Sequence, residues 1–251
     1  MPDTPRDWDG ATYDRISGPQ QGWGREVLER LPLRGEETVL DAGCGSGRVT
    51  EMLAERLPRG HVVAVDASPS MVAAARERLG GRVDVRLMDL QELELEQPLD
   101  AIFSTATFHW IPDHERLFGR LHTALRPGGR LVAQCGGEGN VARTRAAAEE
   151  VSARGPFEPY MRGWPGPWNF SSAELAQQRL LAAGFQEARC WLYDVTVHPP
   201  EPREFLRSVN LGSHLRRLPE ELREPFVDAV YEVVGEPYRI HYVRLNIDAV
   251  A

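Results

Sequence analysis

The sequence contains no lysine, because all 29 of its basic residues are arginines. This absence excludes Schiff-base catalysis, the lysine-containing phosphate loop of P-loop nucleotide hydrolases, and the ATP-pairing lysine of protein kinases. Cysteine is scarce as well. The sequence has three, Cys44, Cys135 and Cys190, which lie far apart in the chain and form no CxxC motif. The cysteines therefore indicate a reducing compartment, and we expect no structural zinc or other metal site.

Long apolar runs and an excess of positive charge are also missing. No apolar run approaches the roughly 18 residues of a membrane-spanning helix, and the polar opening MPDTPRDWDG does not resemble a secretory signal. Thirty-seven acidic residues against 29 basic ones give a net charge of −8, which disfavours a nucleic-acid-binding surface. We therefore expect a cytoplasmic protein, by default a monomer, whose partner is a small molecule and neither a nucleic acid nor a membrane.

Short apolar segments alternate with helical patterns over the first half of the chain. Strands are predicted at 38–42, 61–66, 83–89, 101–105 and 130–135, and helices at 48–57, 69–79 and 113–125. Pro127-Gly128-Gly129 is interpreted as a sharp turn before the fifth strand. This alternation predicts a doubly wound α/β fold around a parallel sheet.

The second half of the chain has a less regular pattern. It predicts helices at 141–154, 172–183, 202–209 and 219–234, and two late strands at 188–197 and 242–249. The late strands are expected at the edge of the sheet, which would then be seven-stranded and mostly parallel. We interpret the chain as four parts: an N-terminal lid segment (1–34), a ligand-binding core (35–136), a helical substrate lid (137–170 and 199–240), and a closing helix with edge strands (171–198 and 241–251).

The most informative segment is the glycine-rich loop that joins the first strand to the first helix of the core. Gly43, Gly45 and Gly47 let the backbone approach a ligand closely at the positive end of the helix. Arg48 stands at the position where a dinucleotide-binding GxGxxG loop has its third glycine. Asp41 is expected at the mouth of the loop, where it suits a cationic ligand better than a pyrophosphate.

Two further carboxylates are predicted at the ends of neighbouring strands. Asp66 ends the second strand, where it can accept hydrogen bonds from both hydroxyls of a ribose, and Asp89 ends the third, within reach of an adenine amine. Either residue alone is also explained as a helix cap or a turn residue. Together with the glycines, these acids predict a site for a cationic nucleoside without phosphates, which describes S-adenosylmethionine. Cys44 is interpreted as a small space-filling residue rather than a nucleophile.

Three segments resemble the motifs of class I S-adenosylmethionine-dependent methyltransferases. They are Val39–Gly47 (VLDAGCGSG), Val65–Met71 (VDASPSM) and Leu125–Leu131 (LRPGGRL), so that the resemblance covers about residues 35–135. It implies S-adenosylmethionine as the cofactor and a Rossmann-like fold. The cofactor-binding residues expected on this basis are Asp41, Gly43, Gly45, Gly47, Asp66, Ala67, Met71, Asp89, Leu90 and Thr105.

Within this family, the sequence is similar to the trans-aconitate and juvenile hormone acid methyltransferases. The similarity lies at Trp8-Asp9, at Tyr13, in FHWIPD (108–113) and in YVRLNI (242–247). It implies methylation of a carboxyl oxygen of a small organic acid, giving a methyl ester and S-adenosylhomocysteine. One departure is QQGWG (20–24), where trans-aconitate enzymes have an arginine-rich first helix, and this favours a less charged acid. A phenol, an amine or a carbon nucleophile is the alternative acceptor.

A carboxylate is already ionised at neutral pH, so this chemistry requires no general base. We expect Trp110 to form a wall of the methyl-transfer site and His109 to orient the substrate oxygen. His109 is alternatively a base for a hydroxyl acceptor, because an imidazole titrates near neutral pH, or both residues merely pack the loop. Gln20 is expected to bind the substrate carboxylate or close the first helix over the cofactor, unless it is a surface residue. Trp8 and Tyr13 are expected either to close the same lid or only to pack.

Several residues in the second half are candidates for substrate recognition. The aromatic residues predict either an apolar acceptor pocket or a lid that packs on itself; they are Phe157, Tyr160, Trp164 and Trp168. A carboxylate is best held by a bidentate arginine, and the candidates are Arg143, Arg145, Arg162, Arg216, Arg217 and Arg244. Two competing functions are a nicotinamide-dependent oxidoreductase, against which Asp41 and Arg48 argue, and a cofactor-binding module without catalytic activity.

Overall fold

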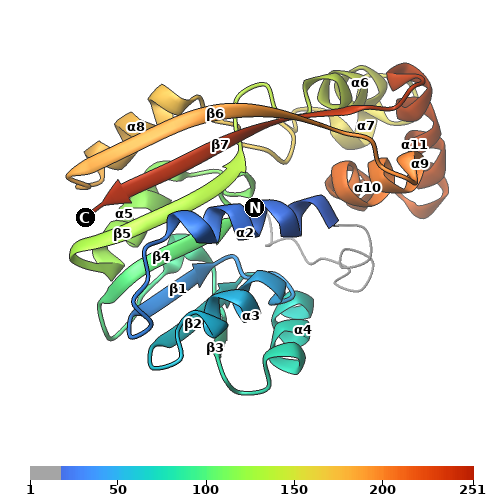
Figure 1. The fold of residues 1–251 in the computed structure, drawn as a ribbon. Helices are drawn as coiled ribbons and strands as arrows, with labels where there is room; N and C mark the ends of the chain where they lie inside the picture. The colour runs from blue at the N-terminus through green and yellow to red at the C-terminus, as the bar shows by residue number, and fades with distance from the viewer. Residues whose placement is uncertain (1–17) are drawn as a thin grey trace. The chain divides into compact units, whose positions relative to one another are not determined.

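The computed structural model describes residues 18–251, with side chains from residue 22 onward (Figure 1). These residues form two compact units. The first comprises residues 18–138 together with Asn169–Tyr193 and Arg244–Ala251, and the second comprises Gly139–Trp168 and Asp194–Val243. The second unit is therefore built from two insertions between elements of the first.

A seven-stranded sheet has the strand order β3-β2-β1-β4-β5-β7-β6. The first five strands are parallel to one another, and β7 is antiparallel to β5. The strands are β1 (Thr38–Ala42), β2 (His61–Asp66), β3 (Asp84–Leu87), β4 (Leu99–Thr105), β5 (Leu125–Gly136), β6 (Glu187–Val197) and β7 (Ile240–Val250). This confirms the predicted doubly wound α/β fold, with a mostly parallel sheet and the two late strands at one edge.

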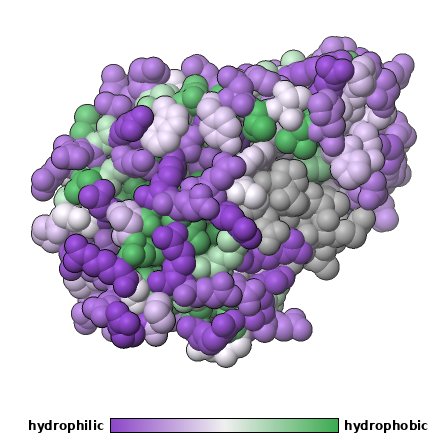
Figure 2. All heavy atoms as spheres, in the orientation of Figure 1, coloured by the Kyte–Doolittle hydropathy of each residue, from purple (hydrophilic) through white to green (hydrophobic). Residues whose placement is uncertain are grey.

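Helices cover both faces of the sheet because alternate strand residues point to opposite sides. On one side, Val39 and Phe103 belong to a buried cluster beneath the helices α2 (Gly18–Arg30), α3 (Arg48–Glu55) and α4 (Pro69–Leu79). On the other side, Leu40 and Ile102 belong to a second cluster beneath α5 (His114–Ala124) and α8 (Ala173–Ala182), as Figure 1 shows. Hydrophilic residues predominate on the face drawn in Figure 2, between smaller hydrophobic patches.

Two helices of the first unit, α4 and α5, begin at polar caps. The Ser68 hydroxyl accepts a hydrogen bond from the Met71 N–H at 3.3 Å, just before the proline that opens α4. The Asp113 carboxylate accepts from the Arg116 N–H at 2.9 Å at the start of α5. Each cap satisfies a backbone donor that the first helical turn leaves without a partner.

The turn predicted before the fifth strand is instead an irregularity inside β5. Leu125 pairs with Leu99 and Arg130 pairs with Ala101, so that five residue steps of β5 lie opposite two of β4. Gly128 has a φ of +78°, and a side chain at Gly129 would lie 2.8 Å from a backbone carbonyl. The glycines therefore allow the chain to fold tightly and return to the sheet. The third strand is also shorter than predicted, since it ends at Leu87.

The second unit contains mostly short helices. They are α6 (Ala142–Ser152), α7 (Glu158–Met161), α9 (Pro202–Phe205), α10 (Gly212–Arg217) and α11 (Glu220–Val234). The sequence did not predict α7 or α10, each of which is six residues or shorter, and the helix expected at 202–209 changes to a π-helical turn at Leu206. No helix within residues 18–251 is long and apolar enough to cross a membrane.

Candidate cofactor and methyl-transfer site

The glycine-rich loop follows β1 and is held by the end of the neighbouring strand β2. The backbone N–H groups of Gly43 and Cys44 both donate to the Val65 carbonyl oxygen, at 2.8 and 3.0 Å. The N–H of Gly45 donates to Oδ2 of Asp66 at 2.9 Å. The loop thus has a fixed backbone at the carboxyl edge of the sheet, where open α/β folds bind their ligands.

Two glycines of this loop are required for different physical reasons. Gly43 has a φ of +85°, and a Cβ atom there would lie only 2.1 Å from Oγ1 of Thr107. Gly45 also has a positive φ, of +54°, but a Cβ atom there would meet nothing within 4 Å. The backbone at Gly45 therefore borders open space, which is what a ligand that approaches the loop closely needs.

Asp66 connects the loop to the start of α4. Its Oδ1 atom accepts from the Ser68 N–H at 2.9 Å, while Oδ2 accepts from the Gly45 N–H. Each carboxylate oxygen has more than one acceptor position, so these contacts are compatible with binding ribose hydroxyls as well. Because an acceptor pair beside an open glycine backbone suits a nucleoside, the residues present fit the ribose of S-adenosylmethionine.

Asp89 follows β3 and caps the short 3-10 helix Leu90–Glu92. Its Oδ1 atom accepts from the Gln91 N–H at 2.9 Å. The capping interpretation of this residue therefore describes its contacts, and a hydrogen bond to adenine stays a prediction. Ala67 follows β2, Leu90 lies in the turn after β3, and Thr105 ends β4. Met71, the remaining predicted cofactor residue, lies in the first turn of α4.

Asp41 does not lie at the mouth of the loop, as the sequence suggested, but inside the protein. Its side chain is only 2% exposed, and Oδ2 accepts from the Thr50 hydroxyl of α3 at 2.7 Å. Burial, with a smaller contribution from the charge of Asp66, raises the pKa of this carboxyl to about 7, although the hydrogen bond from Thr50 acts in the opposite direction. Asp41 therefore connects the end of β1 to α3 through Thr50 and is buried beneath the loop. Cys44 is also buried, and burial raises its thiol pKa well above the ordinary value, which fits a space-filling residue.

His109 and Trp110 lie in the 3-10 turn Phe108–Trp110 that follows β4. The His109 ring is buried at 7% exposure, and its centroid lies 4.9 Å from that of Trp110 and 5.7 Å from that of Phe170. Its Nδ1 atom accepts a hydrogen bond from the Gly136 N–H at 3.2 Å. An imidazole that accepts at Nδ1 carries its proton on Nε2 in the neutral form, so Nε2 is a donor in this arrangement.

Sequence reasoning missed several residues that shape this part of the site. The Thr107 hydroxyl interacts with the carbonyl oxygens of Thr105, at 2.9 Å, and Gly43, at 3.2 Å, and so connects β4 to the loop. Ala106 between them has a φ of +55°, which is unfavourable for a residue with a side chain and is typical of functional sites. Phe170 comes from a segment 61 residues further along, where no local pattern indicated a contact with His109.

Other predicted residues are not brought to this site by the described structure. Trp8, Asp9 and Tyr13 lie outside the described residues. Gln20 lies in α2, but its side chain is outside the described part of the chain.

The aromatic residues of the second unit pack on one another. Trp164 and Trp168 contact the His214 ring at 4.9 and 5.7 Å, and His214 stacks on Phe226, which Phe157 also contacts. These ring contacts favour the alternative in which the aromatic residues pack on one another over that of an apolar acceptor pocket. That the second unit acts as a lid stays a prediction.

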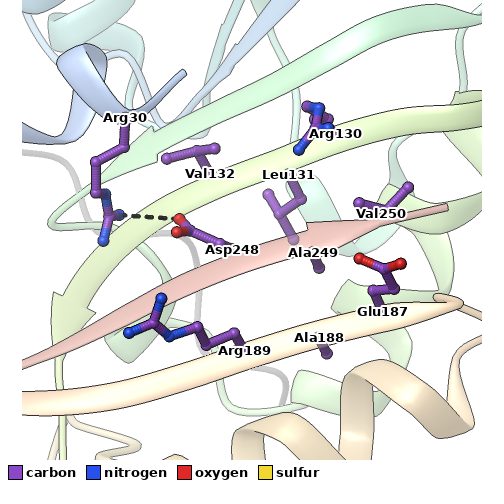
Figure 3. Close-up of a pocket in the computed structure, with 10 residues that line it drawn as sticks. All are labelled: Arg30, Arg130, Leu131, Val132, Glu187, Ala188, Arg189, Asp248, Ala249 and Val250. Atoms are coloured by element: carbon purple, nitrogen blue, oxygen red, sulfur yellow. Dashed lines mark ion pairs between the residues drawn. The ribbon is translucent and has the colours of Figure 1, made fainter. Parts of the chain in front are cut away.

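A groove of about 370 Å³ lies along the part of β5 that is away from Gly136 and His109 (Figure 3). Its floor is formed by β5, β6 and β7, and Arg30 approaches Asp248 there at 3.6 Å. None of the predicted site residues is among the ten that line it. The groove is therefore separate from the glycine loop. Within the described residues, no group of histidine, cysteine and carboxylate side chains is arranged to hold a metal ion.

Comparison with known proteins identifies the family. A family model described as a methyltransferase domain matches residues 39–129. The trans-aconitate 2-methyltransferase of Azoarcus sp. (strain BH72) is 36% identical over 188 residues, which cover 75% of this chain and 66% of that protein. The trans-aconitate 2-methyltransferase of Variovorax paradoxus (strain S110) is 31% identical over 239 residues, which cover 93% of this chain and 91% of that protein.

Solved structures show the same fold at lower sequence identity. Phosphoethanolamine N-methyltransferase 2 of Haemonchus contortus, in complex with phosphomonomethylethanolamine and S-adenosylhomocysteine, gives a TM-score of 0.64 at 22% identity. That match covers 96% of this chain and 56% of the other. The family model and the curated relatives are methyltransferases, so the oxidoreductase alternative is wrong, and so is the alternative of a module without catalytic activity. The chain belongs to the class I S-adenosylmethionine-dependent methyltransferases of small molecules, in the group that includes the trans-aconitate 2-methyltransferases.

Proposed function

We propose that this methyltransferase methylates a carboxylate oxygen of a small organic acid and releases the methyl ester. The observation that carries the proposal is the hydrogen bond from the Gly136 N–H to Nδ1 of His109, at 3.2 Å. In that arrangement the neutral ring has its proton on Nε2, so His109 donates a hydrogen bond and has no vacant basic nitrogen at Nδ1. Such a donor can orient a carboxylate, which is already ionised and needs no base, whereas a phenol or an ammonium group has to lose a proton to a base.

The names of the relatives agree with this chemistry. Both relatives described above are named trans-aconitate 2-methyltransferase, and trans-aconitate is a carboxylic acid. The aligned part spans 66% of the Azoarcus protein. The similarity therefore supports the acid class, and the particular acid is a separate question.

S-adenosylmethionine, when bound, supplies a methyl group activated by its positively charged sulfur. The residues proposed to hold it are the loop backbone at Gly45, the Asp66 carboxylate beside it, and Asp89. The task of the protein is then to position the two reactants and to exclude water. We assign the orientation of the acceptor oxygen to His109 and the exclusion of water to the half-buried Trp110.

Two substitutions of His109 distinguish a donor from a base. Glutamine can accept from the Gly136 N–H and still donate an N–H, but it cannot act as a base near neutral pH. Phenylalanine can do neither. We expect His109→Gln to retain turnover within about tenfold of the unsubstituted enzyme, and His109→Phe to lose about 100-fold, since removing a hydrogen bond to a charged group costs about 1.5–3 kcal/mol.

The measurement is the rate of methyl transfer from labelled cofactor to an organic acid, counted as methanol released by mild base. A base-stable product would contradict the proposal. So would an equal loss of about 1000-fold in both variants, if the turnover of the unsubstituted enzyme also increases as the pH rises through the imidazole pKa. Such a result would instead favour a phenol, an amine or a carbon nucleophile with His109 as the base. Cofactor affinity measured in both variants shows whether the fold is intact.

A further inference from the structure

The segment Asn169–Ser171 contacts the turn that carries His109 and Trp110. It begins where the chain leaves the second unit, because Trp168 is the last residue there and Asn169 belongs to the first unit again. All the contacts described below lie within the first unit. The segment connects two parts of the chain that the sequence patterns treated separately, and its contacts bear directly on the candidate methyl-transfer site.

Asn169 holds the turn at three carbonyl oxygens. Its backbone N–H donates to the carbonyl oxygen of His109 at 2.9 Å. Its side-chain amide donates to the carbonyl oxygens of Ile111, at 3.3 Å, and Pro112, at 2.8 Å. These bonds lie on both sides of Trp110 in the chain. A single asparagine therefore fixes the backbone of the turn both before and after this side chain.

The segment is itself held by neighbouring elements. The hydroxyl of the buried Ser171 accepts from Nη1 of Arg179 in α8 at 2.9 Å and lies 3.1 Å from Nδ1 of His114 in α5. The Ser171 carbonyl oxygen accepts from the Glu138 N–H at 2.9 Å. Nε2 of His114 in turn lies 2.9 Å from the carbonyl oxygen of Phe108, at the start of the turn. The segment is thus a fixed support rather than a loose connection.

The His109 ring lies against this support. Phe170, between Asn169 and Ser171, stacks on it with ring centroids 5.7 Å apart and planes 28° apart. The Gly136 N–H donates to its Nδ1 atom from β5. A ring that orients an acceptor has to keep one position, since a displacement of about 1 Å can cost about 100-fold in rate.

We propose that Asn169 is a positioning residue for methyl transfer, which keeps the His109 ring in the orientation that the proposed function requires. The inference rests on the proposed function for the role of His109. An asparagine amide has two N–H donors, and the structure directs them to the carbonyl oxygens of Ile111 and Pro112. The amide group of Asn169 therefore acts on the backbone of the turn and not on the acceptor.

A role in stability alone would have different consequences. The contact between Asn169 and Pro112 is exposed to solvent, so water can replace the amide there at little cost in free energy. Water does not, however, hold a turn in one position. Loss of the amide should therefore reduce turnover much more than stability, whereas a residue that only stabilises the fold would reduce both together.

The first test is Asn169→Ala in the full chain, with labelled cofactor and trans-aconitate as the probe. We expect kcat to fall by about 10-fold to 100-fold, while the KM and the cofactor affinity stay within about threefold. The melting temperature should stay within about 4 °C. Ser172→Ala is the matched control, because the Ser172 hydroxyl follows the same segment but only caps α8, where it accepts from the Leu175 N–H at 3.2 Å. It should leave kcat within about twofold.

A double-mutant cycle shows whether Asn169 acts through His109. In the His109→Phe background, Asn169→Ala should lower kcat by less than about threefold, because no imidazole remains to be oriented. Nitrogen NMR of labelled histidine gives a second readout that does not depend on the acceptor. At a pH where the ring is neutral, the His109 signals, identified by their loss in His109→Gln, should show a proton on Nε2 alone. Asn169→Ala should give a mixture of the two tautomers.

Losses that multiply in the double variant would overturn the inference, as would an unchanged kcat together with an unchanged tautomer in Asn169→Ala. Asn169→Asp, which has nearly the same size but lacks the N–H donors, should reproduce the loss. If neither variant folds, Asn169 is required for the fold and the inference fails. A base-stable product, with the loss still dependent on His109, would refute carboxyl methylation and leave the role of Asn169 standing. The NMR readout decides the question if trans-aconitate is not methylated.

Discussion

Replacing Asp41 by asparagine tests how the protein holds a buried carboxyl beneath the cofactor loop. The carboxyl is 2% exposed, accepts one hydrogen bond from Thr50 at 2.7 Å, and has its pKa raised by burial from 3.8 to about 7. In the unfolded chain it ionises near the ordinary value of an aspartate. Between these two values the folded state therefore binds more protons than the unfolded state, and stability falls as the pH rises.

The magnitude follows from the difference between the two pKa values. Each unit corresponds to about 1.4 kcal/mol, so that this pKa difference lowers the free energy of unfolding by about 2 kcal/mol at pH 5 and by about 4 kcal/mol at pH 8. Above pH 7 the loss levels off, because the folded state is then ionised too. Asparagine can still accept from Thr50 but has no charge to bury. Asp41→Asn should therefore stabilise the cofactor-free protein, and more at pH 8 than at pH 5.

Urea unfolding at pH 5 and pH 8 measures this difference directly. The matched control is Asp228→Asn, because Asp228 is exposed and pairs with Arg203 on the surface. We expect the control to change the free energy of unfolding by less than about 1 kcal/mol at both pH values. A stabilisation by Asp41→Asn that is the same at both pH values, or a loss of stability at pH 8, would show that the carboxyl is not held against its ionisation.

Four further substitutions test the site. Asp66→Ala should weaken cofactor binding in calorimetry by at least about tenfold, because the loop N–H and the ribose both lose an acceptor; unchanged affinity would remove Asp66 from the site. Gly43→Ala should lower the free energy of unfolding by about 2 kcal/mol, because the methyl group of the alanine would overlap Thr107. Gly45→Ala should lower it by less, because a Cβ atom at position 45 would meet open space. Trp110→Ala should reduce turnover by more than about tenfold while cofactor affinity stays nearly constant; equal losses would mean that Trp110 is only structural.

Much of the fold could be predicted because its signals are local. The strand at 38–42 and the helix at 69–79 were predicted from an apolar run and a helical pattern among neighbouring residues. The folded-over glycines of β5 could not be recognised in this way. Whether Gly128 and Gly129 end a helix or interrupt a strand depends on pairing with β4, and that pairing is not encoded in the segment itself.

The candidate site was predicted as a set of residues but not as an arrangement. Gly45 and Asp66 were expected near each other from the order of parallel strands, and their hydrogen bond has a length of 2.9 Å. Asp41 was misplaced, because sequence alone does not reveal that the Thr50 side of β1 is closed to solvent. The proton position on His109 depends on Gly136, which lies 27 residues away, and no spacing rule connects them.

The most direct test of the account is a count of methyl groups transferred to organic acids. The protein would be mixed with methyl-labelled S-adenosylmethionine and a panel from trans-aconitate to fatty and terpenoid acids, and the label released as methanol by mild base would be measured. The account predicts base-labile label with one class of acid. Cofactor binding without base-labile label on any acid would contradict carboxyl methylation and point to a different acceptor.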